Sequence, residues 1–316
     1  MALRLRLGRF GGRIAITQGH VVILGRSGSG KTNTAKVIVA ELMKRGVPVL
    51  VLDWAGEYAS PRLVRLVPGE NLALDVLPPG SDDPEHVDVI VDLFDAVFHL
   101  TQPQLYMLRL AVKQAIADGC SGIKGILDAL EKVPIRSYYD HETRAALVRR
   151  LAPLSEGRVA RALEGGAPLE AVLSKSFAVD LSVFKSVYAK RLFTLLLLKE
   201  VYDRAVARGP TQGIVHATLI EEAWNVIPYR RPDAEPTIGE RLFAELRKYG
   251  ECAIAVAQNP AEIAWSVVNN AEILVVHAMM PKGYEALGLQ ALALRTGEAI
   301  VIERGRARLV RVRKAR

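Results

Sequence analysis

The segment from Gly25 to Thr32 constrains this chain more than any other, because it matches the pattern G-x-x-x-x-G-K-[ST] at every fixed position. An apolar run, His20–Leu24, precedes it and predicts a buried parallel strand. The residues from Asn33 to Arg45 follow it with the periodicity of an amphipathic helix. A strand, a glycine-rich turn and a helix in this order indicate a phosphate-binding loop rather than a chance turn.

The loop has the chemistry of an anion site. Its glycines allow the backbone to curl so that N–H groups point inward, and the helix N-terminus adds partial positive charge at the same place. We expect Lys31 to reach the β- and γ-phosphates of a bound nucleotide and the Thr32 hydroxyl to ligate Mg²⁺. The residues predicted to bind the nucleotide are Gly25, Arg26, Ser27, Gly28, Ser29, Gly30, Lys31, Thr32 and Asn33.

Size and composition set wider limits. With 316 residues, half of them hydrophobic, the chain can bury the core of one large or two modest domains. The net charge of +8 favours a polyanionic partner, although such a charge is also common in unrelated proteins. Cys120 and Cys252 lie far apart without ligand spacing, so we expect neither a disulfide nor a structural metal. No segment resembles a signal peptide or a membrane span, which indicates a cytoplasmic protein.

A second strand is predicted at Val47–Leu52, and it delivers Asp53 to the edge where α/β sheets bind their ligands. Glu57 follows within the same turn. The two carboxylates either hold metal-bound water and orient Lys31, or cap a helix at the surface. Asp53 is therefore one of three predicted metal ligands, with Thr32 and Glu221.

The strand predicted at Ile214–Ile220 ends in two acids, Glu221 and Glu222. In enzymes with a phosphate-binding loop, the first acid after such a strand supports Mg²⁺ and the second polarises the attacking water. Glu222 is thus the predicted general base. The alternative is that the two glutamates cap a helix, which the complete phosphate loop in the same chain disfavours.

A further strand, Ala253–Ala257, ends in Gln258, whose side chain would lie beside the γ-phosphate and report its presence. Both ends of the chain alternate apolar and basic residues, at Leu3–Leu7 and Arg306–Arg313. These ends could pair at one edge of a sheet, where the charges either discourage aggregation or contact phosphate. A short strand is also expected at Asn71–Leu77.

Helical periodicity replaces strands from Pro84 to about Ala162. The predicted division is a β lead-in at 1–19, an ATPase core at 20–82 and 165–316, and a helical insertion at 83–164. A basic run in the insertion is read either as a solvated helix face or as a nucleic-acid contact. Its residues are Arg144, Arg149, Arg150, Arg158 and Arg161.

The order of these motifs resembles the HerA/VirB4 branch of the HerA–FtsK superfamily of P-loop motors. Besides the loop and the two acids, the resemblance depends on Asp53–Tyr58 and on Arg247–Gly250 leading to Gln258–Ile263. It covers most of residues 20–303. Two features differ: Glu221 replaces the usual aspartate, and the large N-terminal barrel of HerA proteins has no counterpart in this sequence.

The resemblance implies an α/β fold with a RecA-like core, a central mainly parallel sheet and an all-α insertion. It also implies ATP with Mg²⁺ and a homo-oligomer, usually a hexamer, with DNA or a secreted substrate in its pore. Arg247 matches the position of an arginine that completes the neighbouring subunit's site, and a helix C-terminal cation is the alternative reading.

We therefore expect an ATP-hydrolysing DNA translocase, with Lys31, Glu222, Gln258 and Arg247 as catalytic residues. The alternative function is a VirB4-type secretion or conjugation ATPase that docks at a membrane complex without gripping DNA. In that case the protein would lie at the inner face of the membrane.

Overall fold

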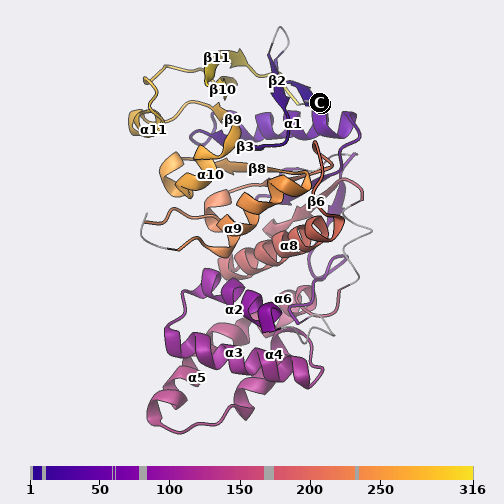
Figure 1. Ribbon diagram of the computed structural model, residues 1–316, viewed down its shortest axis with the longest axis vertical. Coiled ribbons are helices and arrows are strands. Elements are labelled where there is room, and N and C mark those ends of the chain that lie inside the picture. Colours follow the sequence, from indigo (N-terminus) through magenta and orange to yellow (C-terminus); the bar gives the residue numbers. More distant parts are fainter. Residues whose placement is uncertain are drawn as a thin grey trace. The chain divides into compact units, whose positions relative to one another are not determined.

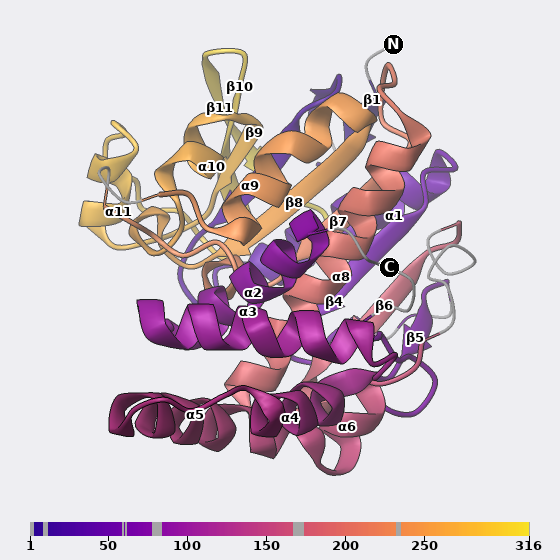
Figure 2. The same cartoon turned by 60° about the horizontal axis from the view of Figure 1, so that its bottom comes forward.

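A mostly parallel sheet forms the centre of the structure. The computed structural model describes residues 3–8, 12–58, 60, 62–77, 84–166, 174–231 and 235–315, and in these residues nine strands form one sheet. Their order is β11-β10-β9-β3-β8-β7-β4-β6-β5 (Figures 1 and 2). The strands from β9 to β4 in this order pair in parallel.

The five parallel strands are apolar almost throughout. They are β3 (His20–Leu24), β4 (Val49–Asp53), β7 (His216–Ile220), β8 (Glu251–Ala257) and β9 (Ala271–Val276). Every residue of β3, β4, β7 and β8 is buried. A strand buried on both faces has no polar side to alternate with, which explains the unbroken apolar runs in the sequence.

Alternate residues of β3 face opposite layers. Val21 and Ile23 belong to a core with Ile38 of α1 (Lys31–Lys44), and α1 packs against β3, β4 and β7. His20 points the other way, and its ring lies 4.4 Å from that of Phe243 in α9 (Ile238–Glu245). Figures 1 and 2 show α1 and α9 on opposite sides of the sheet, so this core is a three-layer structure.

Two edges complete the sheet. β10 (Glu298–Glu303) and β11 (Arg306–Arg311) form an antiparallel hairpin beside β9. β6 (Phe177–Asp180) and β5 (Val64–Leu66) lie beyond β4 at the other end of the sheet. The sequence predicted β6, β10 and β11 but not the short β5.

The N-terminal segment forms its own two-stranded sheet from β1 (Leu3–Arg6) and β2 (Arg13–Ile16). In the described parts of the two chain ends, the backbones pair at one antiparallel bridge between Gly8 and Val312, with a hydrogen bond of 2.8 Å from the Arg313 N–H to the Leu7 carbonyl. The expected pairing of the chain ends is therefore confined to this short contact.

Two further helices follow β8 in the chain, α10 (Trp265–Asn269) and α11 (Pro281–Ala286). The long helix α8 (Val187–Arg208) precedes β7. No helix among the described residues is both long and apolar enough to cross a membrane.

The chain forms two compact units, one of residues 1–65, 170–179 and 201–316, and one of residues 66–169 and 180–200. In the second unit α3 (Gln102–Ala117) packs against three other helices. These are α2 (Pro84–Phe98), α4 (Gly122–Lys132) and α5 (Tyr138–Leu151), and the short α6 (Gly157–Ala162) follows. Thr101 and Gln104 form a capping box at the start of α3, which fixes where this helix begins.

The strand expected at Asn71–Leu77 does not form. The Asn71 Oδ1 accepts from the Val67 N–H at 2.6 Å, and the Asp75 Oδ1 accepts from the N–H groups of Leu77 and Gly122. Short polar side chains that bond to nearby backbone compete with a strand ladder, and they hold this segment in an irregular path.

Most arginines of the basic run form ion pairs or hydrogen bonds with other residues of the helical unit. Arg158 pairs with Glu70 at 2.7 Å, and Arg161 donates to the Gly69 carbonyl. Arg150 donates to the Gln104 Oε1 at 2.6 Å, and Arg144 bonds to the Val133 carbonyl. Four of the five arginines thus hold helices and connections in place, and neither of the two predicted readings describes this role.

Candidate active site

The phosphate-binding loop takes a conformation that only glycine tolerates well. Gly25, Gly28 and Gly30 have φ angles of 149°, 74° and 111°. A Cβ atom on Gly25 would lie 2.6 Å from the Cβ of His277, and one on Gly30 would lie 3.1 Å from the backbone N of Gly297. The loop is therefore packed closely against the segments that follow β9.

Several backbone N–H groups of the loop are free to bind an anion. Among the described residues, those of Gly28, Gly30, Lys31 and Thr32 have no hydrogen-bond acceptor. The Lys31 Nζ donates to the Arg26 carbonyl at 3.2 Å, so its ammonium lies over the loop. Free N–H groups at a helix N-terminus, together with a lysine, form a site for phosphate.

A cavity of about 360 Å³ opens at this loop and brings together side chains from four strand ends. It is lined by Ser27, Gly28, Gly30, Lys31, Thr32, Asn33, Ala55, Glu57, Glu221, Glu222, Val256 and Gln258. The strands β3, β4, β7 and β8 run in parallel, so the segments that follow them meet at one edge of the sheet. Most of the residues predicted from separate motifs therefore line one space.

Two acids follow β7 in different environments. Glu221 is 6% exposed, and burial raises the pKa of its carboxyl to about 7, with Asp53 acting in the same direction. Glu222 is half-buried with φ 46° and ψ 46°, a left-handed conformation that is uncommon for a residue with a side chain. Its Oε2 accepts a hydrogen bond of 2.8 Å from the Trp224 Nε1. The turn thus directs Glu222 into the cavity at some cost in strain.

The cavity is lined by a basic side chain, Lys31, and by acidic ones, among them Glu221 and Glu222. Burial lowers the pKa of the Lys31 ammonium, and Glu222 and Glu221 partly oppose that shift. A cation and two carboxylates around one pocket form an arrangement suited to placing a phosphate beside a proton acceptor.

Asp53 ends β4 as predicted, and its contacts match the capping reading rather than contact with the cavity. Its side chain is 3% exposed and does not line the cavity. The Oδ1 accepts from the N–H groups of Ala55, Gly56 and Glu57, and the Oδ2 accepts from that of Tyr58 at 2.8 Å. These four hydrogen bonds hold the turn after β4 in place. Glu57, from the same segment, lines the cavity.

Gln258 and Arg247 lie at opposite ends of the same strand. Gln258 follows β8 at the carboxyl edge and lines the cavity. Arg247 is exposed and precedes β8, which crosses the sheet between them. Since seven extended residues span roughly 20 Å, the Arg247 of this chain cannot reach the cavity of the same chain.

A buried histidine, His277, lies against the first turn of α1, directly after the phosphate-binding loop. The sequence did not indicate this residue. The His277 Nε2 lies 2.8 Å from the Thr34 Oγ1, and its Nδ1 lies 2.9 Å from the Glu298 carbonyl. The carbonyl can only accept, so Nδ1 carries the proton and Nε2 accepts. Burial lowers the pKa of His277 to about 4, which keeps the ring neutral. A polar residue directly after the strand at 271–276 is the one sequence signal that could have drawn attention to it.

The residues present fit a nucleotide with a divalent cation. The free N–H groups and Lys31 suit phosphate, and the Thr32 hydroxyl and Glu221 line the same cavity. No cluster of three or more His, Cys, Asp or Glu residues suited to a metal occurs among the described residues. One hydroxyl and one carboxylate, from Thr32 and Glu221, suit Mg²⁺, which is usually held by one or two protein oxygens, phosphate oxygens and water.

Comparison with known proteins gives a family and a fold. The family model described as "Helicase HerA, central domain" matches residues 14–201. No curated protein sequence matches the chain.

Two solved structures illustrate the similarity of fold. VirB4 of Thermoanaerobacter pseudethanolicus superposes with a TM-score of 0.75 at 18% identity, covering 99% of this chain and 96% of that one. The plasmid coupling protein TrwB with ADPNP gives a TM-score of 0.73 at 11% identity, covering 100% and 90%. The RecA-like fold with a mainly parallel sheet, predicted from the sequence, is confirmed, and so is the resemblance to this superfamily.

Proposed function

Since this chain belongs to the family of the HerA helicase central domain, we propose that it is an ATP-hydrolysing, Mg²⁺-dependent oligomeric motor that translocates DNA. One observation carries the hydrolytic part of the proposal. Lys31, Thr32, Glu221, Glu222 and Gln258 come from motifs as far as 227 positions apart and line one cavity at the carboxyl edge of the sheet.

ATP as the substrate is supported by the chemistry of the loop and by related structures. TrwB has been solved in complex with ADP and Mg²⁺ and in complex with ADPNP. In this chain the loop N–H groups and Lys31 would hold the phosphates, while Thr32 and Glu221 would hold Mg²⁺, which neutralises charge on them.

In the proposed reaction Glu222 accepts a proton from the water that attacks the γ-phosphorus, and Lys31 compensates the charge that develops on the phosphate oxygens. Gln258 contacts the γ-phosphate from the end of β8. The Glu222–Trp224 hydrogen bond restricts the carboxylate to one orientation before substrate arrives.

Arg247 acts in the site of a neighbouring subunit. The support is its position, because it is exposed at the edge of the sheet opposite to its own cavity. An arginine placed there by a ring-shaped oligomer would stabilise charge on the transferring phosphoryl group. A complete site therefore requires at least two copies of the chain, and a hexamer is the proposed assembly.

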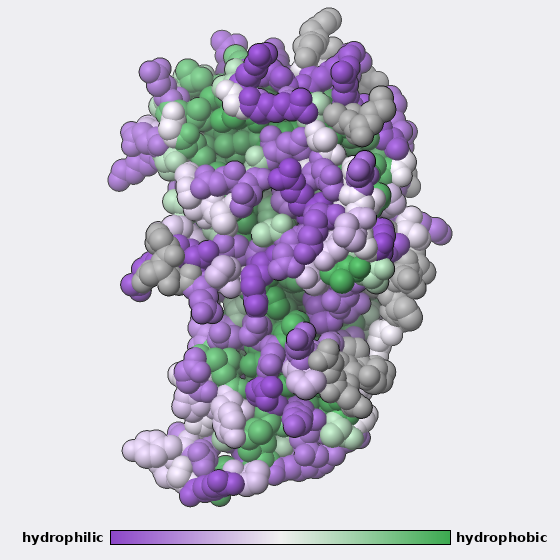
Figure 3. All heavy atoms as spheres, in the orientation of Figure 1, coloured by the Kyte–Doolittle hydropathy of each residue, from purple (hydrophilic) through white to green (hydrophobic). Residues whose placement is uncertain are grey.

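An apolar face of the sheet offers area for such an assembly. Leu274, Leu289, Leu294 and Ile302 are only partly buried around the small core at the β9–β10 end of the sheet. Figure 3 shows the resulting hydrophobic area over β9 and β10, and Leu309 on β11 is 63% exposed. We assign this face to contact with a second copy of the chain, because apolar areas of this kind mark interaction sites.

DNA is the proposed cargo, supported by the family and by the net charge of +8. The alternative is a VirB4-type ATPase that docks at a membrane complex without gripping DNA, which the similarity to the VirB4 fold keeps open. Four arginines of the helical unit bond to groups of that same unit, so the basic run there gives little support for contact with DNA.

The test is the ATPase rate with and without DNA, measured beside the oligomeric mass by light scattering. We expect DNA to stimulate hydrolysis in a salt-sensitive manner, and a mass that grows towards a hexamer with ATP. Glu222→Gln is the matched control: it should bind ATP and lose hydrolysis by roughly a hundredfold or more. Hydrolysis without DNA stimulation would favour the secretion role, and wild-type turnover by Glu222→Gln would remove Glu222 from the mechanism.

A further inference from the structure

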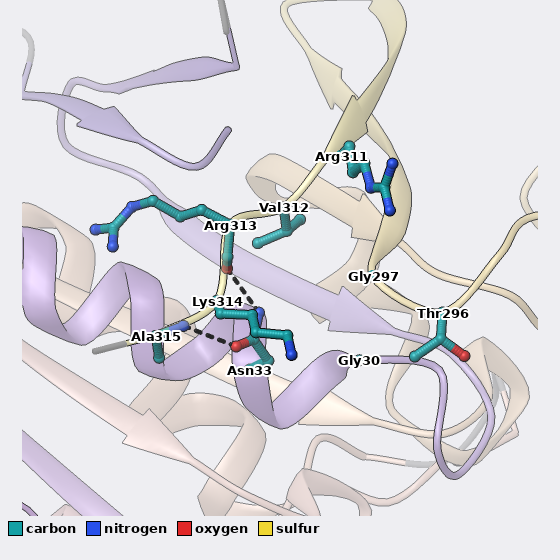
Figure 4. Close-up of a pocket in the computed structure, with 9 residues that line it drawn as sticks. All are labelled: Gly30, Asn33, Thr296, Gly297, Arg311, Val312, Arg313, Lys314 and Ala315. Carbon is teal, nitrogen blue, oxygen red and sulfur yellow. Dashed lines mark hydrogen bonds between the residues drawn. The ribbon is translucent and has the colours of Figure 1, made fainter. Parts of the chain in front are cut away.

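A second cavity, of about 790 Å³, lies beside the phosphate-binding loop. This volume is within the roughly 300–1,000 Å³ typical of small-molecule sites. It shares only Gly30 and Asn33 with the cavity that holds Glu222 and Gln258. Its other lining residues come from the far end of the sequence: Thr296, Gly297, Arg311, Val312, Arg313, Lys314 and Ala315 (Figure 4).

The segment Val312–Ala315 is tied to the loop helix by one side chain. The Asn33 Nδ2 donates to the Arg313 carbonyl at 2.9 Å, and the Asn33 Oδ1 accepts from the Ala315 N–H at 2.9 Å. The Arg313 guanidinium is drawn away from the cavity, since its Nη2 bonds to the Glu41 Oε1 at 3.0 Å. This segment therefore has a defined path along the first turn of α1.

Gly297 connects the same segment to the loop itself. Its N–H donates to the Ser29 carbonyl at 3.0 Å, and its carbonyl accepts from the Val312 N–H at 2.8 Å. One residue thus bonds to the phosphate-binding loop and to the C-terminal segment. The two cavities and the wall between them form one connected structure within the sheet unit.

The direction of a bound triphosphate follows from the first cavity. Glu222 and Gln258 mark the side of the γ-phosphate, whereas the loop N–H groups and the start of the helix hold the α- and β-phosphates. The nucleoside must leave the loop on the side away from Glu222. Gly30 and Asn33 line both cavities, so the second cavity opens directly beside the phosphate-binding loop.

The second cavity has the composition expected around a nucleoside. Val312 and Ala315 offer apolar surface for a base. The Arg311 and Lys314 side chains border the opening in Figure 4, and among the described residues neither has an ion-pair partner. An arginine guanidinium can stack on a base, and either cation can bond to the ribose hydroxyls.

We propose that Thr296–Gly297 and the segment Arg311–Ala315 form the nucleoside subsite of the nucleotide. The ribose and base of a nucleoside phosphate lie against this C-terminal segment, and Arg311 and Lys314 contact them. The inference rests on the proposed ATP-binding function. It adds that a segment about 280 residues from the loop forms the part of the binding site that contacts the nucleoside.

The nucleoside subsite and the phosphate site can be tested separately by comparing a ligand that has a nucleoside with one that lacks it. Isothermal titration compares ADP with inorganic tripolyphosphate, which lacks a nucleoside. The double variant Arg311→Ala/Lys314→Ala should weaken ADP binding about tenfold or more and leave tripolyphosphate binding within about twofold. Arg306→Ala, an exposed arginine of β11 outside the cavity, is the control and should change neither.

Photolabelling with 8-azido-ATP tests the position of the base directly. The label should attach to a residue within 296–315. Equal losses for ADP and tripolyphosphate, no loss for either, or a label on another segment would overturn the proposal. If the wild-type protein binds neither ligand, the proposed ATPase function fails with it, whereas unchanged ADP binding by the double variant refutes the subsite alone.

Discussion

The indole Nε1 of Trp224 donates a hydrogen bond of 2.8 Å to the Oε2 of Glu222, two residues before it in the chain. Such a contact requires a sharp turn, and Glu222 provides it by adopting a left-handed backbone conformation with φ 46°. Strain of this kind persists only where surrounding contacts fix the geometry. The hydrogen bond therefore positions the carboxylate that we assign as the general base.

Replacing Trp224 by Phe keeps the ring and removes this donor. We expect kcat for ATP hydrolysis to fall about threefold to tenfold, with little change in KM, because the carboxylate samples more orientations while the phosphate site stays intact. Steady-state kinetics would measure both constants. Trp265→Phe, at an exposed position in α10, is the control and should have neither effect. A change in KM alone would show that the indole supports binding rather than the base.

The raised pKa of Glu221 predicts how stability depends on pH. In the folded protein without ligand its pKa is about 7, above the ordinary carboxyl value of 4.5. The unfolded chain loses this proton first, so the contribution of Glu221 is fully present below pH 4.5 and is lost as the pH rises through 7. The loss is about 3 kcal/mol at most, by the linkage of pKa to stability.

Urea unfolding at pH 5 and pH 8 measures this effect. The wild-type protein should lose more stability over that range than Glu221→Gln, whose side chain has nearly the same shape and no titratable proton. Identical pH dependence in the two proteins would contradict the assigned environment of Glu221.

The variant Asp53→Ala distinguishes a structural role of this side chain from a role in binding Mg²⁺. Its carboxylate accepts four backbone N–H groups, so Asp53→Ala leaves buried donors without acceptors. We expect a loss of about 2–4 kcal/mol in the free energy of unfolding without nucleotide. Chemical denaturation measures it, and Glu57→Gln, in the same turn but exposed, should cost much less. If Asp53→Ala instead kept its stability and only raised the Mg²⁺ requirement, the metal role would be the correct one.

Mixing a variant of Arg247 with a variant of Glu222 tests whether the two residues act in one site formed by neighbouring subunits. If Arg247 completes a neighbour's site, Arg247→Ala and Glu222→Gln should each be nearly inactive alone. Mixing them in equal amounts should restore activity, because about a quarter of the interfaces in a head-to-tail ring then combine an intact Glu222 with an intact Arg247. Lys248→Ala, the neighbouring exposed cation, should retain activity. A mixture no more active than its components would place Arg247 outside the reaction.

Local chemistry made much of this protein predictable from sequence. The phosphate-binding loop depends on glycines and a lysine at fixed spacing, and the buried strands depend on unbroken apolar runs, so both follow from short segments. The same applies to the two acids after β7, because a parallel strand places whatever follows it at the ligand-binding edge. The sheet, its parallel centre and its family could therefore be predicted.

Other features depend on partners that are distant in the chain. The arginines of the helical unit were read from sequence as a solvated helix face or a nucleic-acid contact, and neither reading includes their bonds to Glu70, Gln104 and nearby carbonyls. The segment Asn71–Leu77 has the apolar content of a strand, but its own polar side chains bind the backbone first.

The sequence by itself determined that a phosphate-binding loop follows a buried strand and that carboxylates end up near it, because both are properties of local pattern and strand direction. Which of these carboxylates faces the cavity depends on contacts that form only when the chain folds. Asp53 turns inward to four N–H groups, while Glu222 turns outward into the cavity. The position of Arg311–Ala315 beside Asn33 likewise depends on hydrogen bonds between residues 280 and 282 positions apart, which leave no trace in local sequence.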